Sequence, residues 1–121
     1  MAMIKQYTDV PEQQAEGLDG VSVRWVITED DGAPHFAMRV FDVQTGQATP
    51  YHKHWWEHEV FVLDGEGVAV QAEGETAISA GSVVLVPGNE MHQFRNTGQG
   101  ALRFICLIPH MSLEGWAESE G

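Results

Sequence analysis

Eight short apolar runs, separated by glycine, proline or charged residues, constrain the fold of this chain more than any other feature. Apolar and polar residues alternate within the runs, as expected where successive side chains of a strand point to opposite faces. No helical stripe of apolar residues stands out. The predicted strands are 21–28, 36–43, 58–63, 68–72, 76–79, 83–86, 91–95 and 102–108. So many short strands in 121 residues predict an all-β sandwich or barrel.

The glycine-rich connections indicate how neighbouring strands pair. The segments 64–67 (Asp-Gly-Glu-Gly) and 73–75 (Glu-Gly-Glu) each join two apolar runs, as hairpin turns do. Both pairs of strands are therefore expected to be antiparallel. The length suits one domain, which we divide into a partly extended N-terminal segment 1–20, a barrel 21–109 and a tail 110–121.

Charge and cysteine content narrow the partners and the compartment. Asp and Glu number 18 against 6 Lys and Arg, a formal net charge of −12, so nucleic acid and anionic membranes are not expected partners. The chain has no apolar run long enough to span a membrane, and its start lacks the pattern of a signal peptide. The single cysteine, Cys106, cannot form an internal disulfide. A cytoplasmic location is the expectation.

Three histidines within seven residues are the strongest chemical signal. His52, His54 and His58 occupy even positions and can share one face of an extended segment, and His92 follows at a second predicted strand. Neutral imidazole is a common ligand of mid-series divalent metals. The spacing predicts a metal site, with the remaining histidines, His35 and His110, expected on the surface.

The same segment also satisfies a zinc-protease pattern. His54 to His58 reads H-x-x-E-H, in which two histidines one helical turn apart bind zinc and Glu57 serves as general base. That mechanism requires a helix, whereas the following residues 60–63 are β-branched or bulky and lead into a glycine turn. We therefore expect strand ligands rather than a helical protease site.

Segment 46–96 resembles the two sequence motifs of the cupin superfamily. The first motif, G-(x)5-H-x-H-(x)3-4-E-(x)6-G, is matched by Gly46, His52, His54 and Gly65, with His58 at the glutamate position. The second, G-(x)5-P-x-G-x-x-H-(x)3-N, is matched by Gly81, Pro87, His92 and Asn96, with Asn89 at the glycine position and Gly88 one residue early.

The resemblance implies a fold and a ligand set. The fold is a double-stranded β-helix, a small jelly-roll barrel. The replacement of glutamate by His58 is similar to a four-histidine subgroup of small cupins, in which His52, His54, His58 and His92 would be the ligands. The likeness favours one divalent Mn(II) or Fe(II) ion per chain, with Cu(II), Ni(II) or Zn(II) also possible. Glu59 fits a looser spacing of the motif but has the opposite strand parity.

Four other residues are candidates for the wall of a substrate pocket. On the last predicted strand, Phe104 and Cys106 share the face opposite Arg103, where they either line the pocket or pack in the core. Trp56 and Phe94 are candidates for apolar lining.

A fifth candidate, Arg39, lies among apolar residues of an earlier predicted strand. Its guanidinium would clamp a carboxylate or stabilise an oxyanion if it reaches the cavity, whereas an exposed arginine is the commoner case. With Phe104 and Cys106, it is a candidate catalytic residue.

The resulting functional hypothesis is a metal-dependent oxidoreductase of dioxygenase type, acting on a small organic substrate at an open metal position. The alternatives are a metal-anchored binding or sensing module without catalysis, and a redox-neutral isomerase or lyase. Ile105 and Leu107 lie on the strand face opposite Phe104, and an exposed apolar face of this kind predicts a homodimer.

Overall fold

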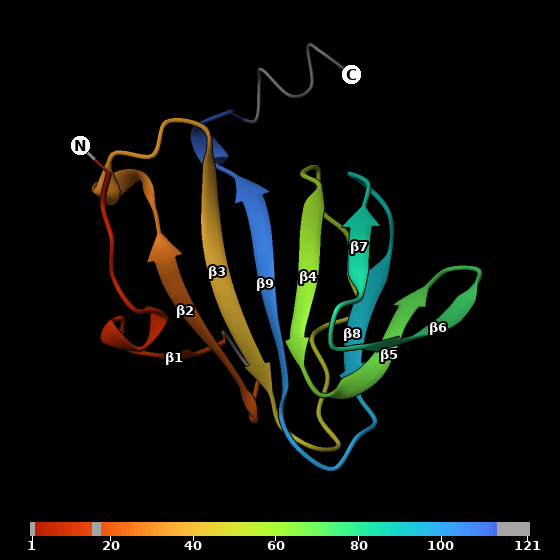
Figure 1. Cartoon of the computed structure of the whole chain (residues 1–121). Helices are drawn as coiled ribbons and strands as arrows, with labels where there is room; N and C mark the ends of the chain where they lie inside the picture. The colour runs from red at the N-terminus through yellow and green to blue at the C-terminus, as the bar shows by residue number, and fades with distance from the viewer. Residues whose placement is uncertain (1, 16–17, 114–121) are drawn as a thin grey trace.

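The computed structural model describes residues 2–15 and 18–113, which fold into two antiparallel β-sheets (Figure 1). The six-stranded sheet has the order β1-β2-β3-β9-β4-β7, and the three-stranded sheet has the order β6-β5-β8. The strands of the large sheet are β1 (Gln13–Gln14), β2 (Val21–Ile27), β3 (Phe36–Val43), β4 (His58–Asp64), β7 (Val83–Val86) and β9 (Leu102–Pro109). Those of the small sheet are β5 (Glu66–Gln71), β6 (Gly74–Ser79) and β8 (His92–Asn96). The all-β jelly-roll architecture is as predicted.

The eight predicted strands are all present, with ends that differ by at most two residues. One further strand, β1, consists of two exposed glutamines, which carry no alternation of apolar and polar residues. Within residues 2–15 and 18–113, three single-turn 3-10 helices connect or flank the strands: η1 (Tyr7–Asp9), η2 (Glu29–Asp31) and η3 (Met111–Leu113). In the described part of the chain, no helix is long and apolar enough to cross a membrane.

The two predicted hairpins have different outcomes. Strands β5 and β6 pair antiparallel across the turn at Gly74, as expected. Strands β4 and β5 do not pair, because they belong to different sheets. Gly65 has a φ of 92° between them, and a Cβ atom there would collide with the backbone of Ala101. The glycine therefore lets the chain pass from one sheet to the other, and the hairpin prediction at this turn was wrong.

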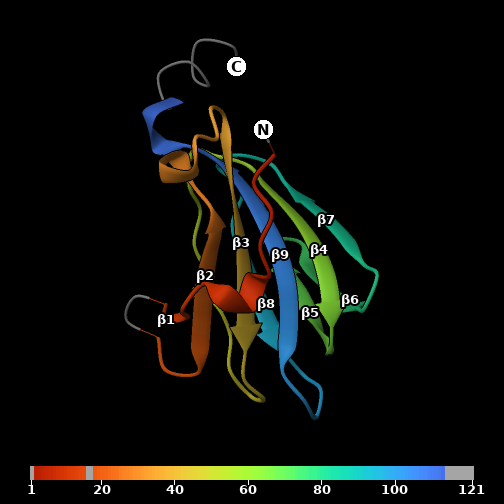
Figure 2. The same cartoon turned by 60° about the vertical axis from the view of Figure 1, so that its left-hand side comes forward.

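The sheets face each other across a shared core, with the small sheet behind β9 and β4 in the turned view of Figure 2. Strand β9 alternates buried and half-buried residues along its whole length, so one face turns toward the small sheet. Phe104 of β9 stacks on Phe41 of β3, with ring centroids 5.2 Å apart, and lies 5.0 Å from Phe94 of β8. This aromatic contact joins the two sheets.

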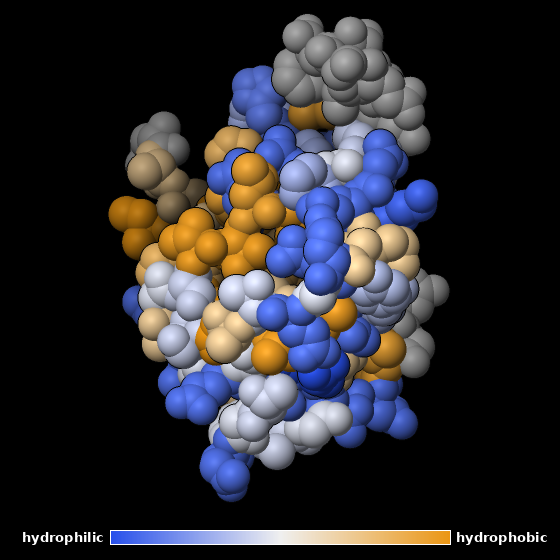
Figure 3. Space-filling view, turned by 90° about the vertical axis from the view of Figure 1, so that its right-hand side faces the viewer, coloured by the Kyte–Doolittle hydropathy of each residue, from blue (hydrophilic) through white to orange (hydrophobic). Residues whose placement is uncertain are grey.

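The opposite face of the large sheet carries exposed apolar side chains. Phe61, Val83 and Leu85 are 46%, 77% and 62% exposed, and the half-buried Ile105 and Leu107 lie beside them in the strand register. Figure 3 shows apolar surface gathered in the upper part of this side of the molecule. The outward direction predicted for Ile105 and Leu107 agrees with their pattern of burial.

Candidate metal centre

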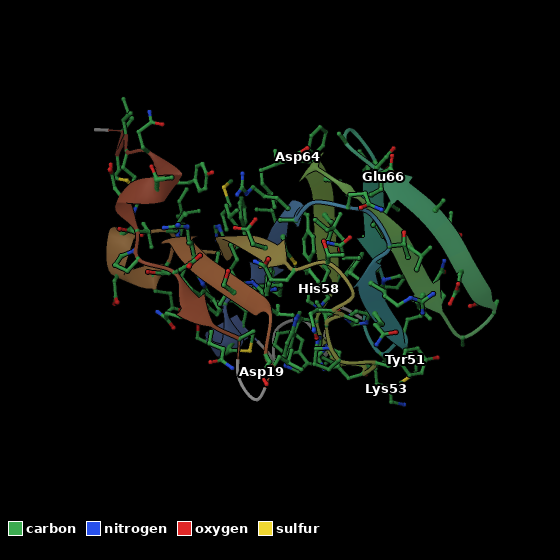
Figure 4. The ribbon with its side chains drawn as sticks, turned by 90° about the horizontal axis from the view of Figure 1, so that it is seen from below. Asp19, Tyr51, Lys53, His58, Asp64 and Glu66 are labelled. Atoms are coloured by element: carbon green, nitrogen blue, oxygen red, sulfur yellow. The ribbon has the colours of Figure 1, made fainter. Side chains whose placement is uncertain are left out.

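The four histidines of the motif come from two strands and one connecting segment. His58 begins β4 and His92 begins β8, whereas His52 and His54 lie in the segment between β3 and β4. His52 and His92 exchange two backbone hydrogen bonds of 3.1 and 2.9 Å, which attach this segment to the small sheet. In Figure 4, His58 lies between the sheets, whereas Tyr51 and Lys53 lie at the rim. The residues of the segment therefore alternate between the interior and solvent, as their even spacing predicted.

Three of the four imidazoles form a compact cluster. One ring nitrogen from each of His52, His54 and His92 lies within 4.8 Å of the other two, close enough for a shared ion. His58 is not part of this three-atom group. Its ring centroid is 4.9 Å from that of His54 and 4.8 Å from that of His92, so its ring borders the cluster. The structure establishes a three-histidine cluster with a fourth histidine beside it.

Hydrogen bonds orient the two strand histidines. The Nδ1 atom of His92 lies 2.9 Å from the carbonyl oxygen of Glu90, which can only accept, so Nδ1 carries the proton and Nε2 keeps a lone pair. The Nδ1 atom of His58 lies 3.0 Å from the sulfur of Cys106. The Nε2 atom of His58 is buried without a hydrogen-bond partner. A buried, unpartnered nitrogen beside three imidazoles fits a metal ligand.

Burial and neighbouring positive charge keep the imidazoles of His52, His54 and His58 neutral. Burial, followed by the charge of Arg39 and the neighbouring histidines, lowers the pKa of His58 to about 2. Burial and the adjacent His52 and His92 lower the pKa of His54 to about 4, and burial also lowers the pKa of His52. A neutral imidazole has the free lone pair that metal coordination requires. The donor set therefore fits a divalent transition metal.

A cavity of about 560 Å³ opens beside the histidines. Its wall contains all five of the candidate pocket residues, namely Arg39, Trp56, Phe94, Phe104 and Cys106. Phe94, Phe104 and Cys106 are also buried members of the core, so pocket lining and core packing are combined in the same side chains. The described residues that line the cavity include no aspartate, glutamate, lysine or tyrosine.

Arg39 supplies the positive charge of the cavity wall. Its guanidinium carbon lies 5.1 Å from the ring centroid of Trp25 and 4.8 Å from that of Phe41, and Nη2 donates to the sulfur of Cys106 over 3.2 Å. Among the residues that the structure describes, no carboxylate lies within ion-pairing distance of Arg39. The guanidinium reaches the cavity, where its described partners are two aromatic rings and the Cys106 sulfur.

Several cavity residues gave no signal in the sequence. Gln13, Gln14, Ala15 and Leu18 line the wall although they lie in the weakly patterned N-terminal segment. Trp25 is adjacent to Arg39 in the register of β2 and β3, a position that the pairing of those strands would have revealed.

Other expectations about individual side chains were right in some cases and wrong in one. Glu57 and Glu59 lie on the outer face of the large sheet, so neither joins the histidines. His58 begins a strand, which excludes the helical H-x-x-E-H site. His35 is exposed, as expected. The expectation for His110 was wrong: it is 6% exposed, because it packs against the segment before β3, where its backbone N–H donates to the carbonyl oxygen of His35 and its Nε2 to that of Ala33.

The departure from the second motif has a structural reason. Asn89, at the glycine position of the motif, has a φ of 64°, the left-handed conformation that asparagine tolerates better than most residues. Its backbone N–H donates to the carbonyl oxygen of His54 over 2.6 Å. The turn thus keeps the shape that a glycine would give and binds the segment that carries His54.

A family model described as a cupin domain matches residues 39–108, more than half of the chain. The chain belongs to the cupin family. It is 32% identical over 71 residues to the 1-methylthio-D-xylulose 5-phosphate methylsulfurylase of Rhodospirillum rubrum, covering 59% of this chain and 46% of that protein. It is 34% identical over 80 residues to an oxalate-binding protein of Thermotoga maritima, covering 63% of this chain and 66% of that protein.

This cupin also resembles a solved structure. The polyketide cyclase RemF from Streptomyces resistomycificus superposes with a TM-score of 0.84 at 29% identity, covering 90% of this chain and 80% of that chain. By contrast, the chain spans about half to two thirds of the length of the two curated relatives.

Proposed function

We propose that this cupin is a metal-dependent enzyme that binds a small, oxygen-rich organic substrate and converts it without net oxidation or reduction. One observation carries the proposal. In a chain with a net charge of −12, the described cavity wall collects four imidazoles and one guanidinium and includes no carboxylate. Such a wall favours ligands that carry, or develop, negative charge on oxygen.

The metal would be held by His52, His54, His58 and His92. The unpartnered Nε2 of His58 and the lowered pKa values of its neighbours support a fourth imidazole ligand. A donor set of nitrogen alone suits Fe(II), Zn(II), Cu(II) or Ni(II) better than Mn(II), which is more often bound by carboxylates. A divalent ion in this position would supply Lewis acidity toward a substrate oxygen.

The cavity residues would bind and orient the substrate. Arg39 holds an oxygen that is anionic or becomes so, because its guanidinium has no described carboxylate partner. The aromatic side chains of Trp25, Phe41, Trp56 and Phe94 pack against the carbon skeleton and exclude water. The volume of about 560 Å³ suits a molecule of one to a few rings.

The redox-neutral reaction is supported by the solved relative, which is a polyketide cyclase. Cyclisation of an oxygenated chain uses polarised carbonyl groups and apolar walls, both of which this cavity would provide. Such a cyclisation needs no electron acceptor. The conserved shape at 29% identity over 90% of the chain makes this the reaction type we favour.

Dioxygenase chemistry, expected from the sequence, stays as the second candidate. The apolar residues Trp56, Phe94 and Phe104 adjoin the histidines and would admit O₂, although the comparisons do not support this reaction specifically. A binding module without catalysis is a third candidate, because a relative at 34% identity is an oxalate-binding protein.

The test is a comparison of Zn(II), Fe(II), Ni(II) and Cu(II) forms against aromatic polyketones, hydroxy acids, diketones and oxalate. We expect product formation without O₂ consumption, in the zinc form as well as in the redox-active forms. O₂ consumption restricted to the iron or copper form would favour the dioxygenase. Binding without turnover by any form would favour the binding module.

We also propose that the apolar outer face forms a homodimer. Phe61, Val83 and Leu85 extend the patch of Ile105 and Leu107, and the pairing of like patches on two copies would cover both. Light scattering should give twice the chain mass for the wild type and the chain mass for Leu85→Lys. A monomeric wild type would contradict the proposal.

A further inference from the structure

Cys106, the single cysteine of the sequence, is a buried free thiol that the proposed chemistry does not use. It is 2% exposed and lies opposite Arg39 of β3 and opposite Val60 of β4 in the strand register. His58 is two residues from Val60 on the same strand face, so the register itself brings the thiol and the imidazole together. The Sγ to Nδ1 distance is 3.0 Å.

We infer that Cys106 is a positioning residue of the metal centre, whose sulfur accepts a hydrogen bond from Nδ1–H of His58 and so holds the tautomer with a free Nε2 lone pair. The inference rests on the proposed metal site. It assigns to the protein scaffold a defined contact that prepares the fourth ligand before any ion binds.

The direction of this hydrogen bond follows from the neighbouring groups. Arg39 can only donate, and its Nη2 lies 3.2 Å from the sulfur but 3.5 Å from Nδ1 of His58. The sulfur therefore already acts as an acceptor, and the longer distance to Nδ1 lies outside the usual range for a nitrogen donor. In the inferred arrangement, Nδ1–H of His58 is the second donor to the sulfur.

The opposite direction leaves a buried donor without an acceptor. If the Cys106 thiol donated to Nδ1, the neutral imidazole of His58 would carry its proton on Nε2. That atom is buried, with no hydrogen-bond partner among the described residues. A buried unsatisfied N–H costs roughly 1–3 kcal/mol. With Nδ1 as donor, Nε2 instead offers a lone pair, which a cation among the imidazoles would use.

The second strand histidine uses the same arrangement. Nδ1 of His92 donates to the carbonyl oxygen of Glu90, which leaves its Nε2 free within the three-histidine cluster. Outer partners of this kind raise the basicity of a ligand and fix its orientation. Cys106 would do for His58 what a backbone carbonyl does for His92.

The experiment compares Cys106→Ala, Cys106→Ser and the control Ile108→Val, in chelator-stripped full-length protein. Ile108 is buried on the same face of β9 as Cys106, but its apolar side chain makes no hydrogen bond to His58. Zinc affinity is measured by competition with a chromophoric chelator, and thermal unfolding reports folding. Nitrogen NMR of the imidazoles reports which nitrogen of His58 carries the proton.

We expect Cys106→Ala to bind zinc roughly 10–100-fold more weakly than wild type, the usual cost of removing an outer partner. Cys106→Ser, whose oxygen also accepts, should stay within about threefold of wild type, and Ile108→Val should match wild type. The NMR spectrum of wild type should show the proton on Nδ1.

Three results would overturn the inference: equal zinc affinity of Cys106→Ala and wild type, an equal loss in Ile108→Val, or a proton on Nε2 of His58 in the metal-free wild type. Failure of the proposed metal site looks different: wild type itself would bind no zinc, while the NMR spectrum would still report whether Nδ1 donates to the sulfur. Failure of the proposed reaction, seen as O₂ consumption or as no turnover, would leave the zinc affinities of these variants unchanged.

Discussion

The two halves of the histidine site are held in different ways. His58 and His92 begin strands, are 6% and 5% exposed, and have side-chain hydrogen bonds at Nδ1. His52 and His54 are half-buried in the segment before β4, where backbone hydrogen bonds position the chain. Their rings have no hydrogen bond among the described contacts. In the proposed metal centre, His58 and His92 would therefore be a rigid pair of ligands, and His52 and His54 a pair that adjusts to the ion.

The largest expected effect separates the two pairs directly. His92→Ala and His58→Ala should each weaken zinc binding by more than the roughly 10–100-fold typical of outer-partner changes, because each removes a preoriented ligand. His52→Ala and His54→Ala should lose less, since a water molecule can replace a half-buried ligand. Competition titrations of the four variants measure this order.

His35→Ala is the matched control for these variants, because His35 is exposed and has no role in the site. His110→Ala is unsuitable, because His110 is buried and bonded to a backbone carbonyl. Equal losses at all four positions would remove the distinction between a rigid and an adjustable pair.

The next prediction concerns the backbone that positions His54, one of the adjustable pair. A Cβ atom on Gly88 would collide with the carbonyl oxygen of Trp55, next to His54. Gly88→Ala should therefore destabilise the fold by about 1–3 kcal/mol, the usual cost of overpacking, and weaken metal binding. Gly100→Ala is the control, because nothing lies within 4 Å of a Cβ atom there. Equal midpoints of urea unfolding for the two variants would contradict the proposed collision with Trp55.

A smaller effect is expected from the aromatic support of His54. Its ring stacks on Trp56, with centroids 4.0 Å apart and planes 11° apart. Such pairs contribute about 0.5–1.5 kcal/mol, so Trp56→Leu should weaken zinc binding roughly three- to tenfold. The stability of the fold should change less than with Gly88→Ala. Unchanged zinc affinity would show that stacking does not orient His54.

A further effect concerns pH and the metal-free protein. The pKa of His54 is lowered to about 4 in the fold, whereas an unfolded histidine has a pKa near 6.5. Below about pH 6.5 the unfolded chain takes up protons that the folded chain does not, so the free energy of unfolding should fall as pH falls toward 4. Urea midpoints measured from pH 7.5 to 5 test this, with His54→Gln expected to give a shallower slope. A midpoint that rises on acidification would contradict the assignment.

The sequence predicted the strands well because apolar alternation directly reports which face of a strand is buried. Strands β3 and β7 have the predicted bounds, and the inward faces of Phe104 and Cys106 follow from parity alone. The turn at Gly65 was misassigned because a glycine turn reads the same whether the next strand pairs or crosses to another sheet.

The candidate site was predictable only in part. Even spacing placed His52 and His54 on the inner side, and the position of His92 at a second predicted strand made it a candidate for the same cluster. The lining by Gln13 and Gln14 was not predictable, because two exposed polar residues carry no periodic signal. The contact between Cys106 and His58 depends on the register of β4 and β9, which no local pattern encodes.

The most direct test of the central claim is a crystal structure of the zinc-loaded protein, with anomalous data collected at the zinc edge. We predict one ion bonded to nitrogen atoms of His52, His54, His58 and His92 at about 2.0–2.2 Å. An ion held by the other three imidazoles alone, with the Nε2 atom of His58 still unbonded, would contradict the four-histidine centre.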